Sequence, residues 1–300
     1  MPKYYHNQPI SIGSMTTAEK IIHFNGVDIC VSTFGLPTAP PIILLAGGAS
    51  SMLFWDEDFC SRLAAGPNFV IRYDLRDTGR STTCEPGAAS YTLRDFADDA
   101  LGVLNAFGLK KAHFVGFSLG GGVSQVIAIE NPDRIAAMTL ISTGPVGAYR
   151  DEPDLPPMSE EHLSKFVALP PPNWSNKEEA VSFLVQHAKL CASSSHDFDK
   201  AIETARASRV FDRSSKLSSM FNHRAIAHTR WARERLREIT VPTLVIHGDE
   251  DCLVPYPHGV ALSKEIPDAE LLTMEQTGHE IPRRVWDTII PAIERHQKDR

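Results

Sequence analysis

The feature that most constrains the fold is an apolar run that ends directly in a glycine-rich bend around one serine. Residues 112–117 read AHFVGF, and residues 116–120 read GFSLG, so a serine stands between two glycines where a strand would end. A helical pattern follows from about residue 119 to residue 130. A sharp strand-to-helix turn strains the backbone of its central residue, and flanking glycines leave the space that this requires. We therefore expect Ser118 at the tip of such a turn.

Apolar runs of strand length alternate with helical patterns along much of the chain. The further strand-like runs are at 42–48, 68–75, 136–142, 242–251 and 269–274, and helical patterns lie at 92–109, 256–265 and 282–296. Continuous apolar strands joined by helices are typical of a parallel sheet. Residues 21–32 alternate around Asn25-Gly26, which predicts an antiparallel hairpin. The sequence thus predicts an α/β protein with a mostly parallel central sheet and helices on both faces.

The alternation stops between residues 145 and 238. Two proline-rich stretches are followed there by three segments with helical rather than strand spacing. We expect 145–238 to form an inserted helical lid, with 21–144 and 239–300 as the two parts of the core. Residues 1–20 are expected to be an N-terminal extension.

Composition excludes several classes of function. The chain has 300 residues, 42% of them hydrophobic and 22% charged, and its net charge is -7, which does not favour nucleic-acid binding. Neither a secretory signal nor a run of eighteen apolar residues is present, and the five cysteines are odd in number and irregularly spaced. We expect a cytoplasmic monomer or homodimer without nucleic-acid or membrane partners.

A serine hydroxyl becomes a nucleophile only beside a base that is itself oriented by an acid. Asp251 closes the predicted strand 242–251, and His279 follows the predicted strand 269–274. Carboxyl ends of parallel strands meet at one edge of the sheet, so Ser118, Asp251 and His279 are expected to form a catalytic triad. Asp249 and Glu250 stay open as alternatives for the acid, and a glycine turn without chemistry stays open for Ser118.

Five segments carry a resemblance to a known family. They read LLAGGASSMLFWDEDFCSRLA, VIRYDLRDTGRSTT, VGFSLGGG, VPTLVIHGDEDCLVPYPHG and TGHEIP. Over nearly the whole chain, this pattern resembles the α/β-hydrolase family, and within it the aclacinomycin methylesterase group, which removes a methyl ester from anthracycline-type polyketides. The resemblance implies the α/β-hydrolase fold and places the triad on Ser118, Asp251 and His279.

The resemblance also implies an oxyanion hole made by the backbone N–H groups of Gly48 and Leu119. Ala46 stands where many relatives carry a histidine, which is a departure from the pattern. Because the following loop borders this hole, its side chains are candidates for a substrate pocket, together with one aromatic of the lid. The candidates are Met52, Phe54, Trp55 and Trp174. No cofactor and no metal are expected.

These observations favour a serine hydrolase that cleaves a carboxylic ester of a bulky apolar or polyketide-like metabolite, with that small-molecule ester as its partner. The same triad would serve a lactone hydrolase or a carbon-carbon bond hydrolase. A small-molecule receptor that does not turn over its ligand is the alternative from another class. A reactive-serine probe that labels Ser118 separates an enzyme from a receptor.

Overall fold

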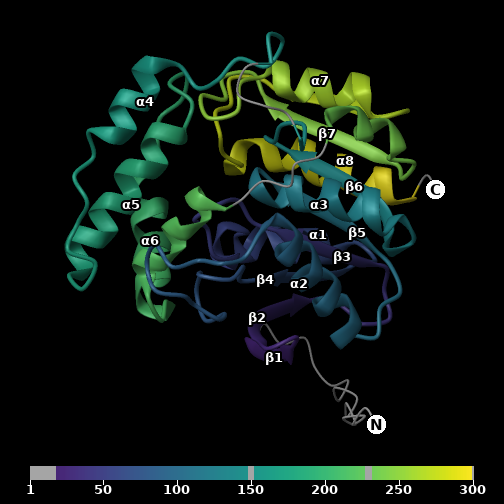
Figure 1. Ribbon diagram of the computed structural model, residues 1–300, viewed down its shortest axis with the longest axis horizontal. Helices are drawn as coiled ribbons and strands as arrows, with labels where there is room; N and C mark the ends of the chain where they lie inside the picture. Colours follow the sequence, from purple (N-terminus) through teal and green to yellow (C-terminus); the bar gives the residue numbers. More distant parts are fainter. Residues whose placement is uncertain (1–17, 148–151, 227–231, 299–300) are drawn as a thin grey trace.

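The structure is a computed structural model that describes residues 18–147, 152–226 and 232–298. Its centre is an eight-stranded sheet in the order β1-β2-β4-β3-β5-β6-β7-β8 (Figure 1). The pair β1–β2 and the pair β2–β4 are antiparallel, and every other pair is parallel. The strands are β1 (Lys20–Phe24), β2 (Val27–Phe34), β3 (Pro41–Leu45), β4 (Phe69–Tyr73), β5 (Ala112–Phe117), β6 (Ile135–Ile141), β7 (Thr243–Gly248) and β8 (Glu270–Met274). The predicted mostly parallel α/β sheet is confirmed.

Helices cover both faces of the sheet. One face carries α2 (Leu93–Ala106), α3 (Leu119–Glu130) and α7 (Pro257–Glu265), and the other carries α1 (Glu57–Ala65) and α8 (Trp286–Lys298). Short 3-10 turns lie at η1 (Met52–Phe54), η2 (Pro132–Arg134) and η5 (Arg283–Val285). Neighbouring residues of a strand point to opposite faces, so a strand covered on both sides is apolar throughout.

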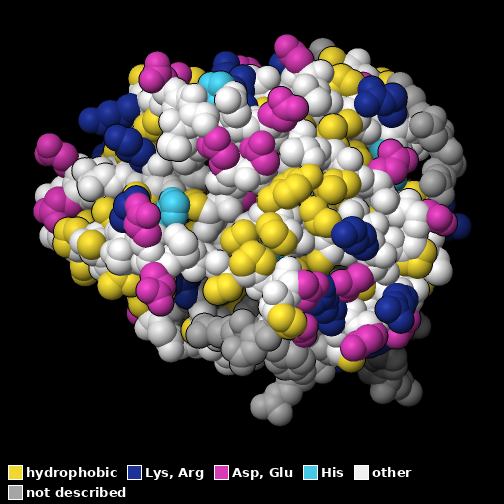
Figure 2. Space-filling view, turned by 90° about the horizontal axis from the view of Figure 1, so that it is seen from above, with side chains coloured by type: hydrophobic (Ala, Val, Ile, Leu, Met, Phe, Trp, Pro, Cys, Tyr) yellow, Lys and Arg dark blue, Asp and Glu magenta, His cyan; other side chains and the backbone are white. Residues whose placement is uncertain are grey.

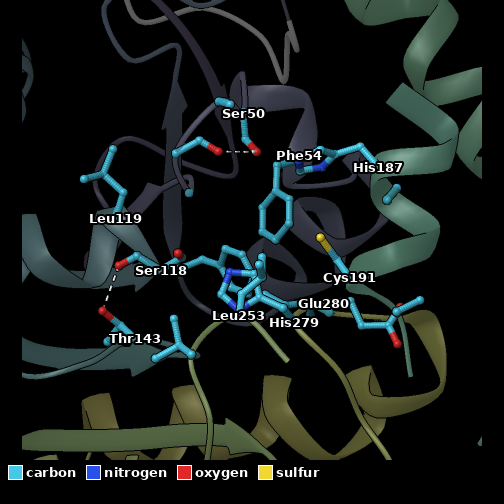
Figure 3. A pocket seen from close by; sticks show the side chains of 18 of the residues that line it. Ser50, Phe54, Ser118, Leu119, Thr143, His187, Cys191, Leu253, His279 and Glu280 are labelled. Carbon is cyan, nitrogen blue, oxygen red and sulfur yellow. Dashed lines mark hydrogen bonds between the residues drawn. The ribbon is translucent and has the colours of Figure 1, made fainter. Parts of the chain in front are cut away.

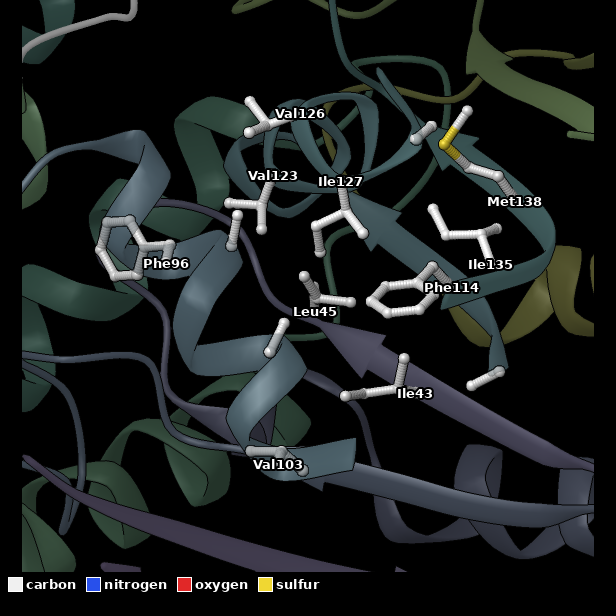
Figure 4. Packing of buried hydrophobic residues seen from close by; sticks show 14 of the residues in the cluster. Ile43, Leu45, Phe96, Val103, Phe114, Val123, Val126, Ile127, Ile135 and Met138 are labelled. Atoms are coloured by element: carbon white, nitrogen blue, oxygen red, sulfur yellow. The ribbon is translucent and has the colours of Figure 1, made fainter. Parts of the chain in front are cut away.

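Strand β3 shows how one apolar run supplies two hydrophobic cores. Ile43 and Leu45 pack under α2 and α3, whereas Ile42 and Leu44 pack against α1 and α8. Figure 4 shows the first core, in which side chains of α2 and α3 meet those of β3, β5 and β6. Each such side chain contributes about 1.5–3 kcal/mol when it is fully buried. These two layers hold the strand ends in fixed positions.

The predicted N-terminal hairpin is confirmed, but the predicted end of the extension is not. Asn25 and Gly26 have φ angles of 49° and 77°, and β1 pairs with β2 on either side of them. The extension was expected to run to residue 20, yet Lys20 already begins β1 and Glu19 forms an ion pair with Arg80. Residues 1–17 lie outside the described residues.

The segment between β6 and β7 is helical. It contains α4 (Glu160–Val167), α5 (Lys177–Cys191), α6 (Lys200–Arg213), η3 (Leu217–Ala225) and η4 (Arg233–Glu238). In Figure 1, α4, α5 and α6 stand to one side of the sheet and its covering helices. Side chains of α5, α6 and η3 share a small apolar core around Ala180, Leu217 and Met220. We call residues 145–238 the lid; residues 148–151 and 227–231 within it lie outside the described part.

None of the helices in the described segments is long and apolar enough to cross a membrane. Figure 2 shows one face of the molecule, on which acidic and basic side chains are interspersed and hydrophobic side chains gather near the middle. Positive charge is not concentrated there, in keeping with the net charge of -7.

Candidate active site

Ser118 lies at the tip of a strained turn between β5 and α3. Its backbone angles are φ 50° and ψ -114°, in a region that residues with a side chain rarely adopt. A Cβ atom placed on Gly116 would lie 2.3 Å from the carbonyl oxygen of Gly120, and one placed on Gly120 would lie 2.5 Å from that of Leu45. The two flanking glycines are therefore required by the close approach of strand and helix.

Backbone hydrogen bonds hold Ser118 in this position. Its N–H donates to the carbonyl of Ile141 at 2.9 Å, and its own carbonyl accepts from the hydroxyl of Thr143 at 2.8 Å (Figure 3). The side-chain hydroxyl of Ser118 makes no hydrogen bond to any residue of the described segments, and Ser118 lines the main cavity. Its hydroxyl is thus available to a ligand.

Asp251 and His279 form a buried pair beside this turn. The Nδ1–H of His279 donates to Oδ2 of Asp251 at 2.8 Å. Oδ1 of Asp251 accepts from the backbone N–H groups of Leu253 and Val254 at 3.0 and 2.8 Å. Burial raises the pKa of the Asp251 carboxyl, but His279, His247 and these hydrogen bonds outweigh burial, so the pKa lies below its ordinary value. Asp251 is therefore ionised at neutral pH.

The neighbouring carboxylates point elsewhere. Asp249 accepts from the backbone N–H of Thr277, and Glu250 accepts from the hydroxyls of Ser193 and Ser195 in the lid. His279 lines the cavity with Ser118, and its ring packs against Phe117 with centroids 4.7 Å apart. The structure thus brings Asp251, rather than its two acidic neighbours, to the histidine.

The two backbone N–H groups expected to form an oxyanion hole lie on adjacent loops. A Cβ atom placed on Gly48 would be 3.9 Å from Cβ of Leu119. Leu119 is the first residue of α3, so its N–H has no partner within the helix. In the described residues, neither N–H donates to another protein group. Two free donors next to Ser118 suit an oxygen that gains negative charge.

The lid holds the loop that carries Gly48, and this support was not predicted. Nδ1 of His223 in η3 accepts from the N–H of Ala49 at 3.0 Å, while its Nε2–H donates to the carbonyl of Arg76 at 2.7 Å. Arg213 at the end of α6 donates to both oxygens of Asp74 at 2.9 and 2.8 Å. Asp74 in turn accepts from the N–H of Met52 at 2.9 Å. No local sequence signal marks the contacts of His223 and Arg213, since their partners are 139 or more residues away in the chain.

A large cavity of about 1360 Å³ lies between this site and the lid. It exceeds the 300–1,000 Å³ or so that is typical of small-molecule sites. Its floor contains Ser118, His279 and the Gly48 loop, and α4, α5, α6 and η3 supply its other walls. Apolar and aromatic side chains predominate among those that line it, including Phe54, Phe117 and Phe166. The cavity has room for a bulky ligand next to the serine.

Three of the four predicted pocket residues do not line this cavity. Phe54 does, but Met52 and Trp55 are buried to 0% and 1% exposure in the protein interior. The reason is the turn η1, which directs consecutive side chains in different directions. Trp174 packs within the lid against Phe183 and Phe221 instead. The predicted pocket is therefore wrong at Met52, Trp55 and Trp174.

Residues 18–147, 152–226 and 232–298 contain no group of three or more His, Cys, Asp or Glu side chains placed to hold a metal ion.

The family model described as the alpha/beta hydrolase fold matches residues 40–282. The chain belongs to the α/β-hydrolase fold family. Ser118 follows β5, Asp251 follows β7 and His279 follows β8, so all three lie beyond the carboxyl ends of parallel strands, as is typical of this fold.

Relatives of this α/β-hydrolase include two methylesterases of Streptomyces. It is 32% identical to rhodomycin D methylesterase DauP of Streptomyces sp. (strain C5) and 31% identical to rhodomycin D methylesterase DnrP of Streptomyces peucetius. Each alignment covers 88% of this chain and 93% of the relative. Among solved structures, the meta-cleavage product hydrolase of Pseudomonas fluorescens IP01 superimposes with a TM-score of 0.73 at 21% identity, over 93% of this chain and 97% of that one. That likeness concerns the fold alone.

Proposed function

We propose that this α/β-hydrolase cleaves a carboxylic ester of a bulky, largely apolar metabolite through Ser118, His279 and Asp251. The observation that carries the proposal is the buried Asp251–His279 hydrogen bond of 2.8 Å, which shares one cavity with the strained Ser118 turn. A histidine oriented by an ionised carboxylate next to an unbonded serine hydroxyl is the arrangement that acyl transfer needs.

Family membership and relatedness to methylesterases make the chain a carboxylic ester hydrolase. The substrate is part of the proposal. The relatives are named rhodomycin D methylesterases, and the cavity of about 1360 Å³ is large enough for a polycyclic ester. We therefore propose a methyl ester of a polyketide-like compound.

The geometry suggests the following course for acylation. The hydrogen bond from Nδ1–H to Asp251 leaves Nε2 of His279 as the unprotonated nitrogen that takes the proton of the Ser118 hydroxyl. The Ser118 oxygen attacks the ester carbonyl, whose oxygen becomes negative and accepts from the N–H groups of Gly48 and Leu119. Each such donor contributes roughly 3 kcal/mol to lowering the barrier. His279 then gives its proton to the leaving alkoxide, and methanol departs.

Deacylation repeats these steps with water. His279 removes a proton from a water molecule, the resulting hydroxide attacks the acyl-enzyme, and the proton returns to Ser118 as the carboxylic acid leaves. Asp251 stays ionised throughout and stabilises the imidazolium each time it forms. The lid excludes bulk water from the cavity, which strengthens the interaction of the two N–H donors with the oxyanion.

The test compares wild type with Ser118→Ala on a panel of chromogenic acyl esters and one aromatic polyketide methyl ester, with products followed by mass spectrometry. We expect release of methanol and the free acid from the methyl ester, and loss of that activity in Ser118→Ala. Ser182→Ala, on the exposed face of α5, serves as the matched control and retains activity. Turnover that survives Ser118→Ala would refute the mechanism. Ring-opened or carbon-carbon cleavage products would instead indicate a lactone or carbon-carbon bond hydrolase.

A further inference from the structure

Four arginines line the cavity, and they differ in how their charge is balanced. Arg206 pairs with Glu203, and Arg283 pairs with Asp56 and Asp58. Arg284 donates to the backbone carbonyls of residues 275 and 276. The fourth, Arg224, has no carboxylate or carbonyl partner anywhere in the described residues, and its guanidinium lies 4.5 Å from the ring centroid of Phe221.

Arg224 is thus an exposed cation on the cavity wall that has no carboxylate partner among residues 18–147, 152–226 and 232–298. Burial lowers the pKa of its guanidinium, because part of the group has lost contact with water. The side chain is still exposed to water in the cavity, so an incoming anion gains by replacing water with a charge-assisted hydrogen bond to the guanidinium. The cavity wall therefore favours a negatively charged group of a ligand at this point.

His187 supplies a second polar group on the same side of the cavity. It projects from α5, and its ring lies 5.0 Å from that of Phe166 and 6.4 Å from that of Phe221. Burial, aided by Arg224 and His279, lowers the pKa of His187 to about 4, so the ring is neutral at pH 7 and carries one N–H. It makes no hydrogen bond within the described segments. Figure 3 shows it extending from α5 toward Phe54.

We propose that Arg224 and His187 form a subsite for an aryl oxyanion, such as an ionised phenol, on the part of the substrate that lies away from the ester. The aromatic rings of Phe166 and Phe221, which both line the cavity, hold the planar ring that carries this oxygen. Arg224 balances its charge, and the N–H of His187 donates to it. The subsite deepens the proposed ester hydrolase by naming the chemical class of its substrate, and it rests on that function.

The test measures binding separately from catalysis. In the Ser118→Ala background, methyl 6-hydroxyanthraquinone-2-carboxylate and its 6-methoxy ether are titrated at a pH where the hydroxyl is ionised, and Kd is taken from quenching of tryptophan fluorescence. We expect the hydroxy ester to bind about tenfold more tightly than the methoxy ester. Adding Arg224→Gln should abolish this preference, and His187→Phe, which keeps an aromatic ring, should reduce it.

Arg283→Gln is the matched control, because it removes a cavity arginine whose charge is already balanced by Asp56 and Asp58. It should leave the preference within twofold. With Ser118 intact, Arg224→Gln should raise KM for the hydroxy ester more than KM for the methoxy ester.

Equal binding of the two esters, binding of neither, or a preference that survives Arg224→Gln would each overturn the subsite. Those results would not contradict the proposed ester hydrolase, because its test also uses simple chromogenic esters. Conversely, absence of ester turnover by wild type, together with an Arg224-dependent preference in binding, would refute the proposed function and retain the subsite.

Discussion

Oδ2 of Asp251 receives the Nδ1–H of His279 across 2.8 Å, while Oδ1 is occupied by two backbone N–H groups. All of the hydrogen-bonding capacity of this carboxylate is therefore directed to holding one tautomer and one orientation of the imidazole. Replacing Asp251 with asparagine would keep the shape of the side chain and place an amide opposite the ring.

We expect Asp251→Asn to lower kcat about 10³- to 10⁴-fold, because the imidazole then loses the carboxylate that selects its reactive tautomer. The measurement is steady-state hydrolysis of a chromogenic ester, with circular dichroism to verify folding. Glu250→Gln is the control, since the Glu250 carboxylate accepts from the lid hydroxyls of Ser193 and Ser195 rather than from His279. A Glu250→Gln enzyme that is as impaired as Asp251→Asn would contradict the assignment of the acid.

His113 should make the protein sensitive to acid. It is fully buried in β5, its Nε2 is 2.8 Å from the hydroxyl of Thr139, and burial together with the nearby His296 lowers its pKa to about 3. In the unfolded chain its pKa is about 6.5, so between these values the unfolded state binds more protons than the folded state. Stability conferred by the neutral ring is complete above pH 6.5 and decreases as the pH falls toward 3.

We expect His113→Gln to flatten this dependence. Urea unfolding at pH 7, 5.5 and 4.5 should show the free energy of unfolding of wild type falling relative to the variant, by a few kcal/mol across the whole window at most. A glutamine variant whose stability follows the same pH curve as wild type would exclude His113 as the cause.

Gly116, before the serine turn, and Gly122, inside α3, should respond oppositely to alanine. The added methyl at Gly116 would lie 2.3 Å from the carbonyl oxygen of Gly120, which is backbone and cannot move away cheaply. We expect Gly116→Ala to cost about 3 kcal/mol of stability and to disturb the serine. Gly122, inside α3, has only Leu93 within 4 Å, at 3.8 Å.

Gly122→Ala should therefore be neutral or stabilise the protein by up to about 1 kcal/mol through helix propensity. Thermal unfolding of both variants, with ester turnover, tests the pair. If both alanines were tolerated equally, the close approach of β5 and α3 would not be what requires glycine at position 116.

Arg213 links the lid to the loop beside the serine. Its guanidinium is 8% exposed and its partner Asp74 is completely buried, so Arg213→Met would leave a buried carboxylate without its cation. We expect a loss of about 3–5 kcal/mol and a lower kcat, because Asp74 also holds the N–H of Met52. Arg209→Met, in the same helix, breaks a pair with Glu57 that is exposed on both sides and should cost less than about 1 kcal/mol. Equal losses in chemical denaturation would contradict this distinction.

The sheet and the serine turn could be predicted because their determinants are local. Buried strands are apolar at most positions, and the turn needs glycine at defined offsets from Ser118. The ends of strands were harder to predict from the sequence. The strand expected at 242–251 ends at Gly248, and the chain then turns through Asp249 and Glu250 before it reaches Asp251. That turn decides which carboxylate meets His279.

The lid contacts could not be predicted, since they join residues far apart in the chain. Nothing near Arg213 or His223 indicates that they hold the loops after β3 and β4. The orientation of Phe54 relative to Met52 and Trp55 depends on a single turn of 3-10 helix. A turn of three residues is too short to produce a periodic pattern in the sequence. Arg224 was missed for a similar reason, because the absence of a carboxylate partner among the described residues is recognised only from the structure.

Strands β6 and β7 lie side by side, with Met138 opposite Thr243, yet the whole lid is inserted between them in the sequence. Because the insertion leaves from one strand and returns to its neighbour, its length and composition are free to vary without changing how the sheet is assembled. The lid side chains that line the cavity are thus encoded in a different stretch of the gene from Ser118, Asp251 and His279. Because Arg213 and His223 hold the loops beside the serine, recombination within the lid keeps that support only where these two residues are retained.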